Sequence, residues 1–294
     1  MTKTAWVFPG QGSQAVGMGS DLFTLSAARE KLAQAEEILG WSVPEICQSQ
    51  EDKISRTVYT QPCLYVVESI LADVVRDRVS QPDLVAGHSL GEYTALYVAG
   101  VFDWLTGLRL VKHRAELMDS AAGGMMAALI GFDCEQLNEQ IAQTPDVVLA
   151  NDNSSAQVVI SGTPEAVEAI LSKVKAKRAV PLNVSGAFHS PLMAQAANQF
   201  EAVLEIVQFA QAQIPVLSNV DPEPSTDGEV LKARLIGQMT GSVRWREICK
   251  RLPDEGIEKV VEIGPGTVLT GLIKRTCPNL ALENISTIES ISKE

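Results

Sequence analysis

Hydrophobic residues follow two patterns along the chain: short continuous runs, and longer segments in which they recur at helical spacing. The runs predict buried strands at 4–8, 83–86, 214–218 and 259–263. The helical spacing predicts helices at 26–39, 63–79, 90–99, 104–118, 193–209 and 231–239. The Thr60-Gln61-Pro62 sequence places a proline in the first turn of the second helix. Strands that alternate with helices are typical of an α/β fold with a parallel sheet.

The segment from 123 to 188 has a different order of elements. Its pattern predicts strands at 125–130, 147–151, 157–161 and 179–184, and helices at 134–142 and 164–175. The resulting order, β-α-β-β-α-β, is the ferredoxin-like arrangement. Such a unit has strands at both ends that lie close together when it is inserted into a host domain. We therefore predict a core domain at 1–122 and 189–294, with an inserted ferredoxin-like domain at 123–188.

The stretch AGHSLGEYTAL places Ser89 between Gly87 and Gly91 at a predicted junction of strand and helix. A nucleophile elbow has this spacing because its sharp turn tolerates only glycine two residues before and after the nucleophile. Such a turn exposes the hydroxyl and places backbone N–H groups beside it, where they can hold an oxyanion. The sequence therefore predicts an α/β-hydrolase-like core in which Ser89 is a candidate nucleophile. An ordinary glycine-rich start of a helix is the alternative.

Composition restricts the classes of function. The 294 residues, 46% of them hydrophobic, suffice for a full α/β core. The net charge of −12 argues against a broad nucleic-acid-binding surface. The five cysteines form no CxxC pair and, with three histidines, show no metal-ligand spacing, so we expect reduced thiols in a cytoplasmic protein. The sequence shows no signal-peptide pattern and no apolar run near about 18 residues, so we expect no membrane insertion.

A glycine-rich loop, PGQGSQAVGMG, follows the first predicted strand. Loops at this place often bind nucleotide phosphates, but this one fits neither GxxxxGK[ST] nor GxGxxG. The residues alone therefore leave a nucleotide cradle open without supporting it.

Three histidines are candidates for the base that takes the proton of Ser89. His88 adjoins the serine and would leave the elbow on the opposite side, so we expect it to pack locally. His113 lies within a predicted helix, where histidines are more often structural. His189, in GAFHSPLM, lies where the inserted domain returns to the core, and substrate sites concentrate in clefts between domains. We favour His189, with a cap of the following helix as its alternative role.

No acid between Ser89 and His189 stands out as the third member of a triad. The candidate aspartates all fit loop or capping positions: Asp103, Asp119, Asp133 and Asp152. The chain thus departs from the hydrolase order of serine, acid and histidine. A main-chain carbonyl is the other group that can orient the imidazole.

Motifs along most of the chain resemble those of malonyl-CoA:acyl carrier protein transacylases of fatty-acid synthesis. They occur in collinear order from Ala5 to Arg275. The motifs are FPGQGSQAVGMG, TQP, GHSLGEY, HRAELM, GGMMAALIG, NDNSSAQVVISG, GAFHSPLM, the glutamine ahead of VRW, and EIGPGTVLTGLIKR.

The resemblance implies a role for several residues of the site. It makes Ser89 the nucleophile and His189 its base, with the backbone carbonyl of Gln238 orienting the imidazole. It places the oxyanion hole at the backbone N–H groups of Gln11 and Leu90. The glycine-rich loop then brings backbone donors to an acyl oxygen instead of cradling a nucleotide.

Two further residues are implied in substrate binding. The position of Arg114 alone, near the end of a predicted helix, predicts a solvated charge or a partner of the helix dipole. The resemblance makes it the residue that binds the malonyl carboxylate, which a planar guanidinium matches with two hydrogen bonds. Phe188, before the base, resembles the bulky residue of malonyl-selective members, which leaves little room for a branched acyl group.

The resemblance implies ping-pong transfer of malonyl from malonyl-CoA to the phosphopantetheine thiol of acyl carrier protein, with no bound cofactor or metal. Acidic carrier proteins need a basic patch on the enzyme. The run from Ser172 to Arg178, or Lys274 with Arg275, are candidates, and solvated helix ends are the alternative. Polyketide synthesis as the pathway, a serine thioesterase or esterase, and a non-catalytic subunit that docks the carrier protein stay open.

Overall fold

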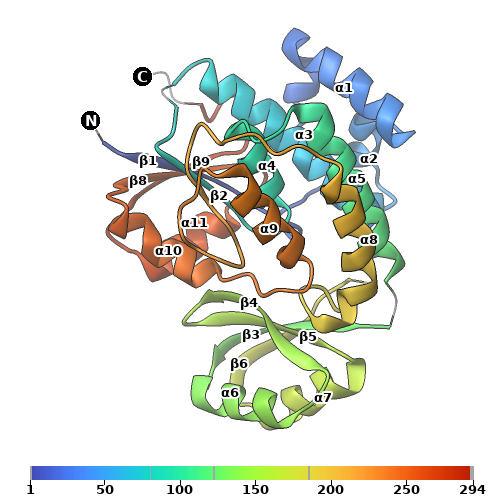
Figure 1. The fold of residues 1–294 in the computed structure, drawn as a ribbon, viewed down its shortest axis with the longest axis vertical. Coiled ribbons are helices and arrows are strands. Elements are labelled where there is room, and N and C mark those ends of the chain that lie inside the picture. The colour runs from blue at the N-terminus through green and yellow to red at the C-terminus, as the bar shows by residue number, and fades with distance from the viewer. Residues whose placement is uncertain (1, 80, 122, 185, 292–294) are drawn as a thin grey trace.

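A parallel five-stranded sheet forms the centre of the larger part of the molecule (Figure 1). The computed structural model describes residues 2–79, 81–121, 123–184 and 186–291. The strand order is β7-β2-β1-β8-β9, and every pair of neighbours is parallel. The strands are β1 (Thr4–Phe8), β2 (Leu84–Gly87), β7 (Val216–Leu217), β8 (Lys259–Ile263) and β9 (Ala281–Ile285). The predicted α/β fold with a parallel sheet is therefore confirmed.

Helices cover both faces of this sheet (Figure 1). Side chains alternate along β1, so Trp6 and Phe8 pack into one hydrophobic cluster while Ala5 and Val7 pack into another. A sheet buried on both faces explains why its strands are continuous hydrophobic runs in the sequence. The helices are α1 (Ser26–Leu39), α2 (Val43–Gln48), α3 (Thr57–Arg76), α4 (Gly91–Val98), α5 (Trp104–Ser120), α8 (Ala194–Glu205), α9 (Gly228–Gln238), α10 (Trp245–Asp254) and α11 (Val268–Thr276).

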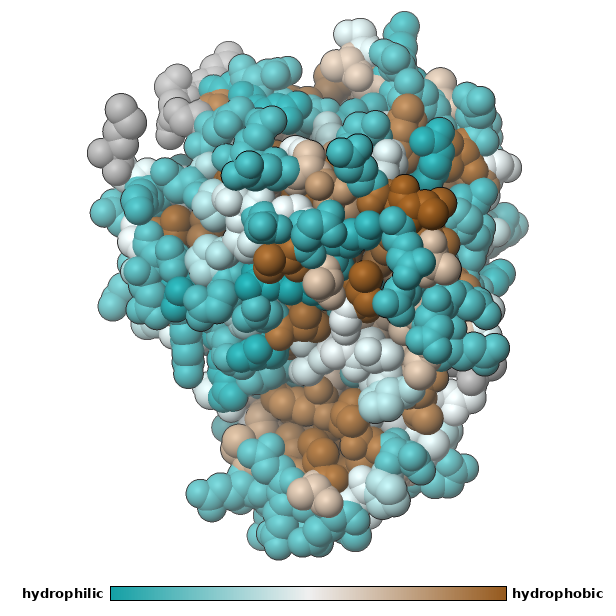
Figure 2. Space-filling view, in the orientation of Figure 1, coloured by the Kyte–Doolittle hydropathy of each residue, from teal (hydrophilic) through white to brown (hydrophobic). Residues whose placement is uncertain are grey.

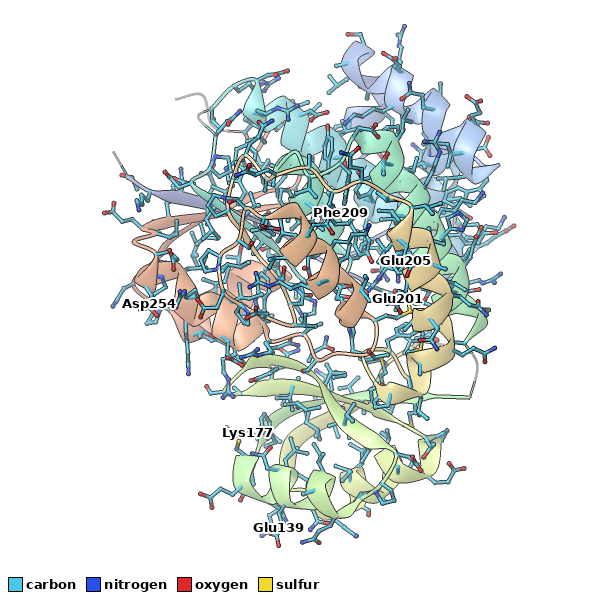
Figure 3. The ribbon with its side chains drawn as sticks, in the orientation of Figure 1. Glu139, Lys177, Glu201, Glu205, Phe209 and Asp254 are labelled. Carbon is cyan, nitrogen blue, oxygen red and sulfur yellow. The ribbon has the colours of Figure 1, made fainter. Side chains whose placement is uncertain are left out.

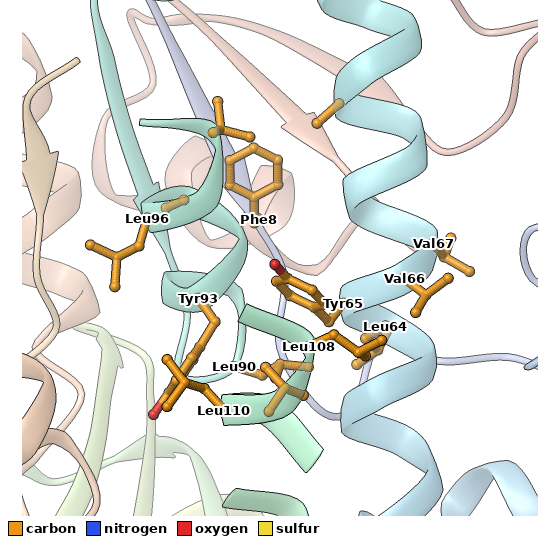
Figure 4. Close-up of a cluster of buried hydrophobic side chains, with 14 of the residues drawn as sticks. Phe8, Leu64, Tyr65, Val66, Val67, Leu90, Tyr93, Leu96, Leu108 and Leu110 are labelled. Carbon is orange, nitrogen blue, oxygen red and sulfur yellow. The ribbon is translucent and has the colours of Figure 1, made fainter. Parts of the chain in front are cut away.

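The larger hydrophobic cluster fixes the elbow helix α4 against the sheet and α3 (Figure 4). Phe8 at the end of β1, Tyr65 on α3 and Tyr93 on α4 are all at most 1% exposed. The cluster thus holds the end of β1 and the start of α4 as one rigid unit.

A second sheet, antiparallel and four-stranded, lies apart from the first (Figure 1). Its order is β4-β5-β3-β6, and α6 (Cys134–Gln143) and α7 (Pro164–Lys173) cover one face. The strands are β3 (Met125–Phe132), β4 (Val147–Ser154), β5 (Gln157–Gly162) and β6 (Ala176–Pro181). The predicted β-α-β-β-α-β order is confirmed. The domain boundaries at 123 and 188 stay a prediction, and these elements all lie between them.

Hydrophilic side chains cover most of the face seen in Figure 2. The largest hydrophobic area of that view lies over the part that contains the antiparallel sheet. That part has its own hydrophobic cluster, which includes Leu129, Leu137, Ile160 and Val167. Within the described ranges, no helix is long and apolar enough to span a bilayer.

Several predicted boundaries were wrong. Helix α3 begins at Thr57, so Pro62 lies inside the helix and not in its first turn. Contacts from elsewhere in the chain hold this early start, because Asp119 on α5 accepts a hydrogen bond from the Val58 backbone N–H. Strand β6 begins at Ala176, three residues early, because it pairs with β3 as an edge strand whose charged side chains face solvent.

Candidate active site

Ser89 lies in the sharp turn between β2 and α4, with a backbone φ of 52°. A Cβ at Gly87 would lie 1.9 Å from the backbone carbon of Gly91. A Cβ at Gly91 would lie 2.0 Å from the carbonyl oxygen of Phe8. Both positions therefore require glycine, as the elbow interpretation of GHSLG expects. Positive φ at a serine is a strained conformation that persists only where the surroundings hold it.

His189 lies beside the serine, 100 residues away in the sequence. Its Nε2 is 2.8 Å from the Ser89 Oγ, and its Nδ1 lies 2.9 Å from the Gln238 carbonyl oxygen and 3.2 Å from that of Gly241. Because a carbonyl only accepts, Nδ1 carries the proton and Nε2 presents its lone pair to the hydroxyl. The geometry is that of a nucleophile, a base and an orienting acceptor.

Burial lowers the pKa of His189 to about 3, and the charge of Arg114 acts in the same direction. His189 is 4% exposed, so the charged form of its imidazole loses most of its hydration. It is therefore neutral at neutral pH and able to accept a proton.

We expect the rate at which Ser89 is loaded to stay unchanged when the pH falls well below 6.5, which is the ordinary pKa of histidine. His189 stays neutral in that range. The unfolded chain binds a proton that the folded chain does not, so the same group lowers the free energy of unfolding as pH falls from about 6.5 towards 3. Single-turnover acylation from pH 4 to 8, with denaturant unfolding at pH 5 and 7, measures both effects. A loss of rate centred near pH 6.5 contradicts the burial effect.

Arg114 is 1% exposed and points at the same hydroxyl. Its guanidinium donates to the Ser89 Oγ at 3.0 Å, the Gln238 Oε1 at 3.1 Å and the Gln61 Oε1 at 2.8 Å. Its centre also lies 5.4 Å from the ring of Tyr93. Burial lowers the pKa of the guanidinium, opposed by Tyr93 and by Glu92. A buried cation thus lies next to the position where an acyl group on Ser89 would be.

The two backbone groups predicted for the oxyanion hole, the N–H groups of Gln11 and Leu90, have no hydrogen-bond acceptor among the described residues. The Ser89 N–H, in contrast, donates to the Asn219 Oδ1 at 2.6 Å. The two predicted donors are therefore free to bind an acyl oxygen, and the serine's own N–H is not.

A cavity of about 410 Å³ lies next to the elbow, between the loop after β1, the antiparallel sheet and α11. Its lining includes Gln11, His88, Asn151, Asn153, Leu182 and Leu272. Ser89, His189 and Arg114 are not among its lining residues, although His88, next to the nucleophile, is one; the Ser89 Oγ contacts both His189 and Arg114. Phe188 is 5% exposed and packs in the large hydrophobic cluster.

The other two histidines lie away from the nucleophile's proton. His88 Nε2 is 2.8 Å from the Asn153 Oδ1, and its ring packs near Trp245, as its expected local role requires. His113 is about half exposed, with Glu116 3.7 Å away. The described residues include no group of three His, Cys, Asp or Glu side chains arranged to hold a metal ion.

Sequence reasoning missed three polar side chains of this site. Gln61, Glu92 and Asn219 all contact the residues above. Gln61 and Glu92 lie within TQP and GHSLGEY, but neither was assigned a role. Asn219 carries no local sequence signal, since it follows a two-residue strand.

Comparison with known proteins places this chain in a class of acyl-transferring enzymes. Residues 5–293 match the family described as the acyl transferase domain, and the chain belongs to that family. It is 62% identical to the malonyl CoA-acyl carrier protein transacylase of Synechocystis sp., over 99% of both chains.

Solved structures have the same fold. The crystal structure of Synechocystis sp. malonyl-CoA:ACP transacylase is 62% identical, with a TM-score of 0.97 over 98% of this chain and 99% of that one. A malonyl-transacylase in complex with a type II polyketide synthase acyl carrier protein is 37% identical, with a TM-score of 0.92 over 99% and 98% of the two chains.

Proposed function

We propose that this protein transfers the malonyl group of malonyl-CoA to the phosphopantetheine thiol of an acyl carrier protein, with Ser89 carrying the group in between. One observation carries the proposal: the Ser89 Oγ lies between the lone pair of a neutral imidazole and a buried guanidinium. The first activates a nucleophile, and the second recognises a carboxylate. The named relatives, all malonyl transacylases, support the same substrate.

In the loading step, His189 Nε2 takes the hydroxyl proton as Oγ attacks the thioester carbonyl. The oxyanion receives hydrogen bonds from the Gln11 and Leu90 N–H groups, for which the described residues supply no acceptor. Collapse of the tetrahedral intermediate breaks the carbon–sulfur bond, and the coenzyme A thiolate takes the proton from His189. The product is malonyl ester on Ser89 and free coenzyme A.

In the transfer step the same groups act in reverse order. The carrier thiol gives its proton to His189 and attacks the ester carbonyl, and Ser89 leaves with that proton. Transfer to the thiol and not to water requires that the ester stays shielded, which the small exposure of His189 and Arg114 supports.

Recognition of malonyl is assigned to Arg114. The malonyl carboxylate accepts hydrogen bonds from the guanidinium. In this structure one of the guanidinium donors is bonded to the Ser89 Oγ. Because the charge of Arg114 lowers the pKa of His189, a bound carboxylate also raises that pKa and strengthens the base. Phe188 limits the space for branched acyl groups from its buried position beside the base.

Fatty-acid synthesis in the cytoplasm is the proposed setting, without a resident cofactor, and polyketide synthesis is the alternative pathway. The reaction products separate this proposal from a thioesterase. With malonyl-CoA and holo acyl carrier protein, we expect malonyl-carrier protein as the main product. Free malonate as the main product indicates a hydrolase.

The two basic patches are alternative docking sites for the carrier protein, and they lie differently relative to the cavity. Lys274 and Arg275 are exposed on α11, just beyond Leu272, which lines the cavity. Lys173, Lys175 and Lys177 are exposed around the start of β6, and the nearest cavity-lining residue along the chain is Leu182, after the end of that strand (Figure 3 labels Lys177). The first patch is therefore nearer the path of the phosphopantetheine arm.

We expect Lys274→Glu with Arg275→Glu to lower kcat/KM for the carrier protein roughly tenfold at low salt, because exposed charges act on encounter. Loading from malonyl-CoA should change little. The triple variant Lys173→Glu, Lys175→Glu, Lys177→Glu is the matched control. The opposite result, loss in the triple variant alone, places the carrier protein on the antiparallel sheet.

A further inference from the structure

Glu92, on α4 three residues after the nucleophile, is a buried carboxylate that the mechanism above does not use. It is 1% exposed. Its Oε2 accepts two hydrogen bonds, from the Gln238 Nε2 at 2.6 Å and from the Asn219 backbone N–H at 3.1 Å. Neither donor is near Glu92 in the sequence, so the carboxylate joins α4 to two separate segments.

The first of these, Gln238, contacts the side chains of His189 and Arg114 and the backbone of Ser89. Its carbonyl oxygen orients the imidazole of His189. Its side-chain Nε2 also donates to the Ser89 carbonyl oxygen at 3.0 Å, and its Oε1 accepts from Arg114 at 3.1 Å. The backbone of Gln238 therefore holds the base, and its side chain holds the nucleophile's backbone and the cation.

The second, Asn219, clamps the elbow itself. Its Oδ1 accepts from the Ser89 N–H and its Nδ2 donates to the Gly87 carbonyl oxygen, both at 2.6 Å. These bonds hold the backbone on both sides of the turn in which Ser89 has its positive φ. The Asn219 backbone is in turn held by Glu92.

The charges of the network also match. Arg114 is the buried cation of the site, and Tyr93 and Glu92 both raise the pKa of its guanidinium against the effect of burial. Burial raises the pKa of Glu92, while the bonds from Gln238 and Asn219 and the charge of Arg114 oppose that shift. Two donors on one oxygen suit an ionised carboxylate.

We propose that Glu92 is a positioning residue of the Ser89–His189 pair, which acts through Gln238 on the imidazole and through Asn219 on the elbow. The Ser89–His189 pair has no carboxylate in direct contact with the imidazole. Glu92 supplies one indirectly, because Gln238 lies between Glu92 and His189. This inference rests on the proposed function for its roles of Ser89 and His189.

The substitution Glu92→Gln tests the inference, since it keeps the shape and one acceptor oxygen but removes the charge. Glu68→Gln is the matched control. Glu68 is equally buried and contacts the same helix through Thr94, without a hydrogen bond to the active-site residues in the part of the chain described. Burial raises the pKa of Glu68 well above its ordinary value, as it raises that of Glu92, so the control repeats the loss of a buried carboxyl group away from Gln238 and Asn219, and it should react as the wild type does.

The readout is the rate at which phenylmethanesulfonyl fluoride modifies Ser89. This reagent carries no carboxylate, so it reports the nucleophile and base without Arg114 recognition. We expect Glu92→Gln to react about tenfold more slowly, as for loss of one charged hydrogen bond. Combined with Gln238→Ala, which keeps the backbone carbonyl, the effect should be smaller than the product of the two single effects. A purely structural role changes the unfolding midpoint and leaves the two effects multiplicative.

Wild-type reactivity of Glu92→Gln, or multiplicative effects, overturns the inference. If Glu92→Gln does not fold, Gln238→Asn tests the same link, because the shorter amide cannot reach the carboxylate. A slowed Gln238→Asn supports the inference and an unchanged one overturns it. A wild-type chain that reacts with the sulfonyl fluoride but takes no malonyl overturns the proposed function alone.

Discussion

Ser89→Ala should form no covalent malonyl adduct, and His189→Ala should load Ser89 about 10²–10⁴-fold more slowly than the wild type, as expected for loss of a general base. The Ser89 hydroxyl oxygen is the nucleophile, so without it no atom of the site can carry the malonyl group. The imidazole only accelerates proton removal, and the Gln11 and Leu90 donors remain in its absence. Rapid-quench measurement of acyl-enzyme formation with labelled malonyl-CoA gives both rates.

His113→Ala is the matched control for the base. Its imidazole is about half exposed on α5 and should be dispensable. A labelled adduct on a cysteine, such as the exposed Cys134, would instead assign the nucleophile elsewhere. Equal losses in His113→Ala and His189→Ala would remove the basis for assigning His189 as the base.

Arg114→Ala should lower the ratio of kcat/KM for malonyl-CoA over acetyl-CoA by roughly 10²-fold or more. The two acyl groups differ by one carboxylate, so selectivity depends on a group that is left unpaired without it. A charge-assisted hydrogen bond contributes about 1.5–3 kcal/mol, and about 1.4 kcal/mol corresponds to tenfold. Two such bonds in a site where Arg114 is 1% exposed give an effect of this size.

Acetyl loading should stay level or rise, because an apolar acyl group no longer faces an uncompensated cation. Arg114→Lys should restore malonyl loading only in part, since an ammonium cannot form the planar pair of bonds. Arg109→Ala, an exposed arginine on the same helix, is the matched control and should leave the ratio unchanged. A ratio that barely moves in Arg114→Ala would reduce Arg114 to a structural charge.

The sequence predicted the elbow well because its requirements are local. Gly87, Ser89 and Gly91 lie within five residues, and the clash that demands glycine arises within the turn and at the neighbouring strand. The remaining contacts of Ser89 are distant in the chain: His189 is 100 residues away and Gln238 lies a further 49 along. No spacing rule links such positions: His189 was favoured only from its place at the domain junction, and the role of Gln238 came from the resemblance.

The polar network behind the pair was not predictable from local patterns. Glu92 follows the elbow at the start of α4, where an acidic residue already suits the helix dipole. Its partners become visible only when α9 and the segment after β7 are placed against α4. This carboxylate is a candidate positioning group because it is buried, and the residue type alone does not indicate burial.

Some elements of the fold had a clear pattern in the sequence but were not predicted. Trp245, Ile248, Cys249 and Leu252 recur at helical spacing and are all buried on α10, so that helix had a clear signal. The start of α3 had none, because a hydrogen bond from Val58 to Asp119 on another helix sets it. Strand β9 is a short edge strand of mixed composition, which periodicity alone seldom identifies.

Intact-protein mass spectrometry after mixing with malonyl-CoA, followed by peptide mapping and addition of holo acyl carrier protein, tests the central claim most directly. We predict a single malonyl adduct on Ser89 that disappears as malonyl-carrier protein forms. An unmodified Ser89, or an adduct that the carrier protein cannot remove, would contradict the proposed transfer.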